Sequence, residues 1–165
     1  MANILHKGGV HIKDSTQIKF LEEQGFIFAS FFLLANKLQV IGDQHLQSVG
    51  LTTKQWFLIA AVQSFATPPT LSEVSELIGS SRQNVKQLAL KLEQKNFLKM
   101  VKDNKALRLV LTDHCHKFWK DRDDIDKKFI SEIFSCLSEE EANIISSGFK
   151  KIISRINEKS KLLGV

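Results

Sequence analysis

The clearest pattern in the chain lies in residues 70–112, where apolar positions recur first at helical spacing and then in alternation. Thr70 and Glu73 open this segment with the spacing of a capping box, in which each side chain bonds the other residue's backbone N–H. The apolar positions that follow are three or four residues apart: Leu71, Val74, Leu77 and Ile78. Gly79 comes next, so the pattern predicts a short helix that ends at this glycine.

A second helix is predicted directly after the first. Ser80 and Gln83 have the spacing of another capping box. Val85, Leu88 and Leu92 then form an apolar stripe. Two helices that meet within one turn form a sharp corner, so the pair predicts a helix-turn-helix. The stripe leaves several polar side chains near the start of the second helix facing outwards: Ser81, Arg82, Gln83, Lys86 and Gln87.

After Asn96 the apolar spacing changes to alternation, which predicts two strands. The apolar positions of the two strands are Leu98 and Met100, then Leu107, Leu109 and Leu111. Residues 102–106 form the tip between them, where Asn104 tolerates a positive φ and Lys102 and Lys105 supply two ammonium groups. A hairpin that follows a helix-turn-helix is a wing, so the segment predicts a winged helix-turn-helix.

The outward side chains of the second helix suit a nucleic acid. Arg82 can bond guanine with two N–H groups, and Gln83 and Gln87 can bond adenine in the same way. Lysines at the tip suit a phosphate backbone or a minor groove. We therefore predict a DNA-binding site that consists of Ser80, Ser81, Arg82, Gln83, Lys86, Gln87, Lys102, Asn104, Lys105 and Arg108.

Positive charge is concentrated in the same segment. Residues 80–112 contain eight Lys and Arg against two Asp and Glu, a net charge of +6, whereas the whole chain is +5. The rest of the chain therefore has a net charge of −1. This distribution favours double-stranded DNA as the partner. The alternative is a winged helix that docks a partner protein without specific DNA binding.

Long apolar helices are predicted on both sides of the winged helix. The first dozen residues show no periodicity and are expected to be an arm, and a helix is expected from Asp14, capped with Gln17, to about Leu46. Its centre, Phe26 to Ala35, is apolar nearly all round. That run is shorter than the about 20 apolar residues of a membrane span, and it lacks a secretory cleavage site. We therefore expect a second subunit, not a membrane, to cover it.

Three more helices complete the expected fold, which is mainly α with a small two-stranded β wing. One is capped by Thr52 and Gln55 and precedes the Pro68-Pro69 break, one starts at Thr112 or Asp113, and the last is boxed by Ser138 and Glu141. The apolar stripes of the terminal helices predict a homodimer. The chain then divides into residues 1–47 (N-terminal arm and dimerisation helix), 48–112 (winged helix-turn-helix DNA-binding domain) and 113–165 (C-terminal dimerisation helices).

In this order the elements resemble the MarR (multiple antibiotic resistance regulator) family of dimeric transcription factors. The resemblance spans most of the chain and rests on the long N-terminal helix, GLTTKQWFLIAAV, LSEVSELIGSSRQNVKQLALKLEQKNF and the closing Leu111-Thr112. The wing departs from the family's Asp-x-Arg tip, because Asp103 is followed by Lys105. The resemblance implies a DNA-binding transcriptional regulator, a repressor, that acts as a homodimer on a pseudo-palindromic operator.

The resemblance also implies an effector. In similar proteins a small aromatic or phenolic molecule binds between the dimerisation layer and the DNA-binding lobe and releases the operator. His45, Trp56 and Trp119 lie on the helices that connect these two parts, so we predict the effector pocket there. The alternative is that both tryptophans are ordinary core residues.

Other chemistry is expected to be absent. His114, Cys115 and His116 are neighbours on one helix and point in different directions, so we predict no metal site, although a metal-responsive regulator that also uses His45 is an alternative. A redox-responsive regulator is another, but Cys136 has apolar neighbours that favour an inert core thiol. No phosphate loop, nucleophile elbow or HExxH motif occurs, so neither a catalytic site nor a cofactor is predicted. With no secretory signal, the expected location is the cytoplasm.

Overall fold

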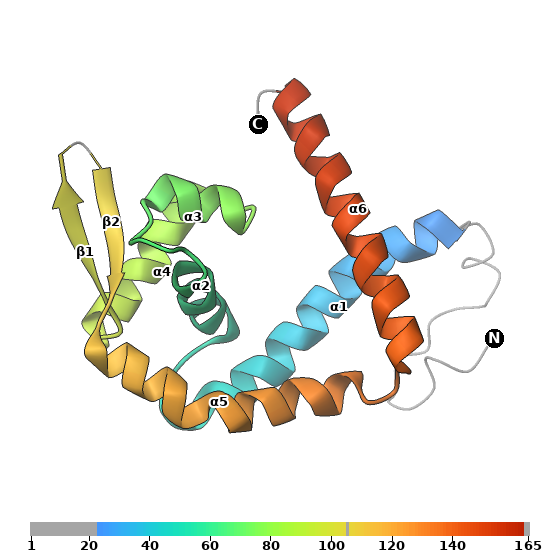
Figure 1. Ribbon diagram of the computed structural model, residues 1–165, viewed down its shortest axis with the longest axis horizontal. Coiled ribbons are helices and arrows are strands. Elements are labelled where there is room, and N and C mark those ends of the chain that lie inside the picture. Colours follow the sequence, from blue (N-terminus) through green and yellow to red (C-terminus); the bar gives the residue numbers. More distant parts are fainter. Residues whose placement is uncertain (1–22, 105, 164–165) are drawn as a thin grey trace. The chain divides into compact units, whose positions relative to one another are not determined.

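The computed structural model describes residues 23–104 and 106–163. These residues form helices and one two-stranded antiparallel hairpin (Figure 1), so the predicted fold class is confirmed. The chain folds as two compact units that divide between Leu111 and Thr112. The predicted arm and the predicted helix start at Asp14 lie outside the described residues.

The first unit contains the long helix α1 (Glu23–Leu46), the 3₁₀ turn η2 (Gln47–Val49), α2 (Thr53–Gln63), α3 (Leu71–Leu77), α4 (Arg82–Gln94) and the hairpin strands β1 (Leu98–Asp103) and β2 (Ala106–Leu111). The second unit contains α5 (Asp113–Phe134) and α6 (Glu139–Leu163). The predicted caps at Thr52, Thr70, Thr112 and Ser138 are all confirmed. Local hydrogen bonding by short side chains therefore sets most helix starts in this protein.

The predicted capping box at Ser80 and Gln83 is wrong. Helix α4 starts one residue later, with Ser81 as its N-cap, whose side chain accepts a hydrogen bond from the Asn84 N–H. Ser80 belongs instead to the end of α3, because its N–H bonds the Ser75 carbonyl while the Gly79 N–H bonds Glu76. This pair of bonds is a Schellman motif, which requires the left-handed conformation that Gly79 adopts (φ +62°).

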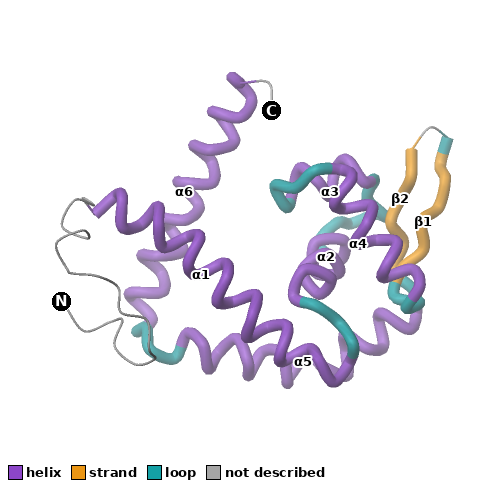
Figure 2. Tube along the Cα trace, turned by 180° about the vertical axis from the view of Figure 1, so that it is seen from behind, coloured by secondary structure: helices purple, strands orange, loops and turns teal. Residues whose placement is uncertain are grey.

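The core of the first unit lies where α2, α3, α4 and the hairpin meet (Figure 2). On α4 the buried stripe consists of Val85, Ala89 and Leu92, while the predicted Leu88 is half-buried. Other fully buried side chains come from each surrounding element: Leu58, Ile59, Val74, Leu98 and Leu109. This apolar contact fixes the buried face of α4 and so turns its opposite face outwards.

The hairpin has the predicted alternation. Leu98 pairs with Leu111 and Met100 with Leu109, and the last pair, Asp103 with Ala106, leaves a two-residue connection. Asn104, the first residue of that connection, has the positive φ (55°) that its side chain tolerates. The expected tip of residues 102–106 is therefore narrower than predicted, because strand pairing extends to Asp103.

Most of α1 is uncovered in the single chain. Only Gly42 and Leu46, near its end, are buried, and exposed apolar side chains occur along the rest: Phe26, Ile27, Phe28, Phe32, Leu33, Leu34, Val40 and Ile41. By length and composition alone, residues Glu23–Val49 could cross a membrane, with a mean hydropathy of 1.5 in an 18-residue window. The expectation that this segment is too short for a span was wrong, because its apolar character extends well beyond Phe26 to Ala35.

Helix α6 also lacks a covered face. None of its described residues is buried, and its exposed apolar residues follow helical spacing: Ile144, Ile145, Phe149, Ile153 and Ile156. Among the residues predicted for this stripe, Ile152 is half-buried. An apolar stripe that its own chain leaves exposed is typical of a helix that packs against another subunit.

Candidate nucleic-acid interface

The start of α4 presents a polar, basic face. Arg82, Gln83, Lys86 and Gln87 are exposed, which confirms their predicted orientation. No acidic residue opposes the positive charge in the first turn of α4. Side chains of this kind, projecting from a helix whose other face is anchored in a core, can reach base edges and phosphates in a major groove.

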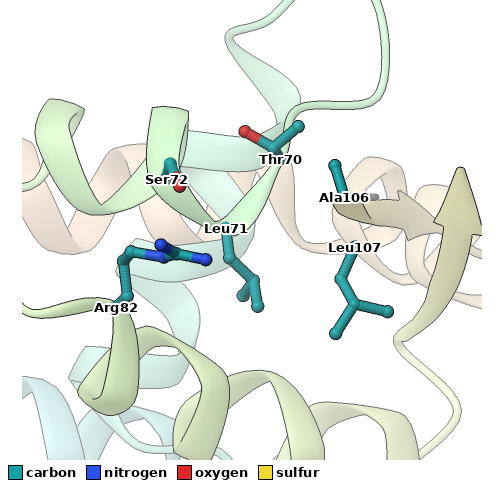
Figure 3. A pocket seen from close by; sticks show the side chains of 6 residues that line it. All are labelled: Thr70, Leu71, Ser72, Arg82, Ala106 and Leu107. Atoms are coloured by element: carbon teal, nitrogen blue, oxygen red, sulfur yellow. The ribbon is translucent and has the colours of Figure 1, made fainter. Parts of the chain in front are cut away.

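The Arg82 side chain borders a hollow between three elements. This cavity, of about 280 Å³, is lined by Thr70, Leu71 and Ser72 at the start of α3, by Arg82, and by Ala106 and Leu107 of the wing. In Figure 3 the guanidinium of Arg82 points from α4 towards Leu71, across from the wing residues. The starts of both helices and the wing therefore converge on one side of the first unit.

The predicted wing residues differ in their exposure and in their contacts. Lys102 and Asn104 are exposed, whereas Lys105 lies outside the described residues. Arg108 is engaged within the protein: its Nε lies 2.6 Å from Asp103 Oδ2, and its Nη1 donates to the Pro68 carbonyl at 2.9 Å. The hydrogen bond that Arg108 donates to the Asp103 carboxylate raises the pKa of the Arg108 guanidinium further. These contacts give Arg108 a structural role that the sequence did not predict.

The predicted effector residues do not line this hollow. His45, Trp56 and Trp119 are each half-buried, and none of them belongs to its lining. His45 and Trp56 lie in the first unit and Trp119 in the second. The effector pocket thus stays a prediction.

The two cysteines lie in different environments. Cys115 is fully buried, and burial raises the pKa of its thiol to about 11. Cys136 is exposed in the turn between α5 and α6, so the expectation of a core thiol there was wrong. The reason is that its neighbour Phe134 is itself exposed and builds no core around it.

The histidines flank the buried thiol. His114 and His116 are both exposed, on either side of Cys115, so the three side chains diverge as the helical geometry predicted. In residues 23–104 and 106–163, no group of three or more His, Cys, Asp or Glu residues is placed to hold a metal ion.

A thiol reagent is expected to modify one cysteine per native chain, Cys136, and both cysteines after unfolding. At about pH 8 the buried Cys115 is almost entirely protonated, and the neutral thiol is a poor nucleophile. The measurement is the number of reactive thiols with and without guanidinium. Cys136→Ser is the matched control and should bring the native count close to zero. Rapid modification of both thiols in the native wild-type protein would contradict this assignment.

The sequence matches no protein-family model and no curated protein. The structure is similar to a MarR/EmrR family transcriptional regulator from Acinetobacter sp. ADP1, with 18% sequence identity and a TM-score of 0.73 over 84% of this chain and 99% of that one. It is similar to S. aureus MepR in a complex with DNA, with 20% identity and a TM-score of 0.68 over 78% and 96%.

A third similar structure is the organohalide-sensing transcriptional regulator RdhR in its 2,4-dichlorophenol-bound form. The sequences are 13% identical, and the TM-score is 0.74 over 88% of each chain. The fold thus defines a winged helix-turn-helix protein with long helices before and after the winged helix. More specifically, it is the fold of the MarR-family transcriptional regulators, as the resemblance in sequence predicted.

Proposed function

We propose that this protein is a MarR-family transcriptional regulator that binds double-stranded DNA through α4 and the wing. The observation that carries the proposal is the exposed polar face of α4, which contains Arg82, Gln83, Lys86 and Gln87 and no acidic residue. This face lies in a segment with a net charge of +6, in a chain whose remainder is close to neutral. Concentrated positive charge on a groove-sized helix is the electrostatic signature of a DNA-binding surface.

The proposed active form is a homodimer. Its support is the exposed apolar surface of α1 and α6, since a soluble monomer rarely leaves apolar surface of this extent in water. Two-fold symmetry would present two copies of α4 to DNA, about 34 Å apart, and would favour a pseudo-palindromic operator. We propose that the dimer acts in the cytoplasm as a repressor.

We propose that a small aromatic effector regulates the protein by releasing it from its operator. The support is the RdhR structure, which contains 2,4-dichlorophenol, and the half-burial of His45, Trp56 and Trp119 in this chain. Half-buried indole rings suit an aromatic ligand and would report its binding by fluorescence. An effector can release the operator by favouring a dimer in which the two copies of α4 are not one DNA turn apart. It need contribute only a few kcal/mol, because each 1.4 kcal/mol changes affinity about tenfold.

The division of labour between helix and wing gives the test of DNA binding. Arg82→Ala is expected to relax sequence preference, because the operator should lose base contacts that a random duplex never made. Lys102→Ala is expected to weaken operator and random duplex alike and to reduce the salt dependence by about one unit of slope per contacting subunit. Gel shifts at several salt concentrations measure both, with an operator selected from a randomised duplex library.

A control variant and the DNA binding of the wild-type protein distinguish DNA from a protein partner. Glu76→Gln on α3 is a control for a general change in charge, since Glu76 is exposed and lies outside the α4 face. It should leave sequence preference unchanged. If the wild-type protein selects no sequence and binds random duplex without salt dependence, the winged helix docks something other than DNA.

A further inference from the structure

We propose that Asp103 and Arg108 are a positioning pair that holds the wing at a fixed place beside α4, and that Arg108 does not bind DNA directly. This inference rests on the proposed function and specifies how its wing operates. Arg108 stands among the basic residues of the +6 segment, where charge alone would assign it to phosphate. Its contacts with Asp103 and Pro68 instead assign it a structural role within the wing.

The pair lies on one face of the hairpin. In the strand register Arg108 is opposite Val101, and Asp103 is opposite Ala106, so Asp103 and Arg108 are diagonal neighbours on the same face. The Asp103 carboxylate accepts from Arg108 Nε at 2.6 Å. The hydrogen bond therefore links the end of β1 to the middle of β2, next to the tip.

The same guanidinium fastens the hairpin to the chain that precedes α3. Arg108 Nη1 donates to the Pro68 carbonyl at 2.9 Å. The next residue, Leu109, donates its N–H to the Pro69 carbonyl at 2.8 Å, and Arg108 forms a β-bridge with Thr70. Prolines have no N–H to donate, so Pro68 and Pro69 can bond β2 only through their carbonyl groups. The Leu109 backbone supplies the donor for Pro69, and the Arg108 side chain supplies the donor for Pro68.

The attachment joins the walls of the hollow beside α4. Thr70 and Ala106 both line that hollow (Figure 3). Thr70 follows Pro69 in the chain, and Ala106 is paired with Asp103 in the strand register. We call the Asp103–Arg108 pair and its hydrogen bond to the Pro68 carbonyl the clamp. While these contacts are formed, the exposed Lys102 and Asn104 keep a fixed distance from Arg82. Wing and helix then approach DNA as one preformed surface, which lowers the entropy lost on binding.

Asp103 is the part of the pair that charge alone cannot explain. It is one of two acidic residues in the +6 segment, and a carboxylate next to DNA repels phosphate. Paired with Arg108, it forms a locally neutral unit whose arginine fork is already occupied. The two side chains remain 46% and 37% exposed, so the pair contributes modestly to stability, and its main effect is on geometry.

Asp103→Asn separates the two explanations because they predict opposite signs. If Asp103 only adds negative charge, its removal should tighten binding to every duplex. If it positions the wing, operator affinity should fall about threefold to tenfold while random-duplex affinity is unchanged or rises, since a loosened wing still carries its lysines. Glu76→Gln is the matched control that removes one exposed carboxylate outside the clamp, and it should not weaken operator binding.

Arg108→Lys provides the second variant. Lysine keeps the positive charge but has no planar fork to bond Asp103 and Pro68 together, so it should reproduce the loss seen with Asp103→Asn. A direct phosphate contact would instead tolerate lysine. The exchanged pair, Asp103→Arg with Arg108→Asp, should regain part of the operator affinity at unchanged net charge.

The measurements are gel shifts on the selected operator and on random duplex, with a thermal melt of each variant. Weaker operator binding by both Asp103→Asn and Arg108→Lys, with random-duplex binding retained, supports the clamp. Operator binding by Asp103→Asn that equals or exceeds the wild type overturns it. Failure of the proposed function looks different, because the wild-type protein itself would then select no operator.

Discussion

Replacement of both Phe28 and Phe32 by glutamate is expected to convert the proposed dimer into a monomer. The two rings are 65% and 62% exposed in the single chain and pack edge to face, with centroids 5.3 Å apart. Burial of a phenylalanine side chain contributes roughly 1.5 to 3 kcal/mol, and two-fold symmetry doubles each substitution. Glutamates at these positions would also bring unpaired charges into an apolar contact.

Operator affinity of this double variant is expected to fall by at least about a hundredfold, because the second half-site would no longer be bound within the same complex. Light scattering at micromolar concentration gives the mass, and gel shifts give the affinity. Phe57→Glu is the matched control, since Phe57 on α2 is 51% exposed but lies outside α1 and α6. It should leave the dimer intact.

The same experiment tests the membrane interpretation of α1. A wild-type protein that is dimeric and dispersed without detergent would support a second subunit as the cover of the apolar helix. A wild-type monomer with full operator affinity, or a protein that disperses only in detergent, would contradict the proposed dimer. The composition of Glu23–Val49 alone does not distinguish these cases, which is why the sequence argument about its length failed.

Features that depend on local chemistry were predictable from the sequence. The caps at Thr52 and Thr70 follow from side chains that bond backbone three residues away, and the hairpin follows from alternation. Ser80 shows the limit of such rules. Its spacing to Gln83 is that of a capping box, but the end of α3 uses the Ser80 N–H, so the start of α4 depends on how the previous helix closes.

The outward face of α4 was predictable because helical period alone separates it from the core. The role of Arg108 was not, since its partner Pro68 lies 40 residues away in the sequence. Lys95 is a second example. It counts towards the +6 charge, yet its Nζ bonds the Gly50 carbonyl and Gln55 Oε1, at the start of α2. Charge counted along a sequence therefore overstates the cations available to DNA.

A single methyl group added at Gly42, where α1 contacts the start of α2, should strongly destabilise the fold. At Gly42 the helix approaches Thr53 so closely that an added Cβ would collide with Oγ1 of Thr53 and lie 3.1 Å from its Cγ2. Thr53 cannot simply turn away, because its N–H bonds Asp43 Oδ1 at 2.6 Å and its hydroxyl donates to the Gln39 carbonyl at 3.1 Å. The backbone hydrogen bond from Thr53 also lowers the pKa of Asp43, so this carboxylate is charged at neutral pH.

Gly42→Ala is therefore expected to lower the free energy of unfolding by about 1 to 3 kcal/mol, as overpacking of a well-packed contact does. Urea denaturation measures the change. Thr53→Ala removes the colliding atoms, so the double variant should be less destabilised than the sum of the single variants, by about 0.5 kcal/mol or more. Additive effects of the two substitutions would mean that the helices separate instead of clashing.

Gly42→Ala should also affect DNA binding, because the residues that it displaces at the start of α2 are hydrogen-bonded to the end of α4. Gln55 lies two residues after Thr53, and its Oε1 accepts from the Thr52 N–H at 3.2 Å and from Lys95 Nζ at the end of α4. A shift of α2 against α1 therefore moves the anchor of α4 relative to the proposed dimer helix. We expect Gly42→Ala to weaken binding to a full operator more than to a single half-site, and to broaden the tolerated half-site spacing. Equally weakened binding to the full operator and to a single half-site would show that the contact between α1 and α2 stabilises the fold without setting the distance between the two copies of α4.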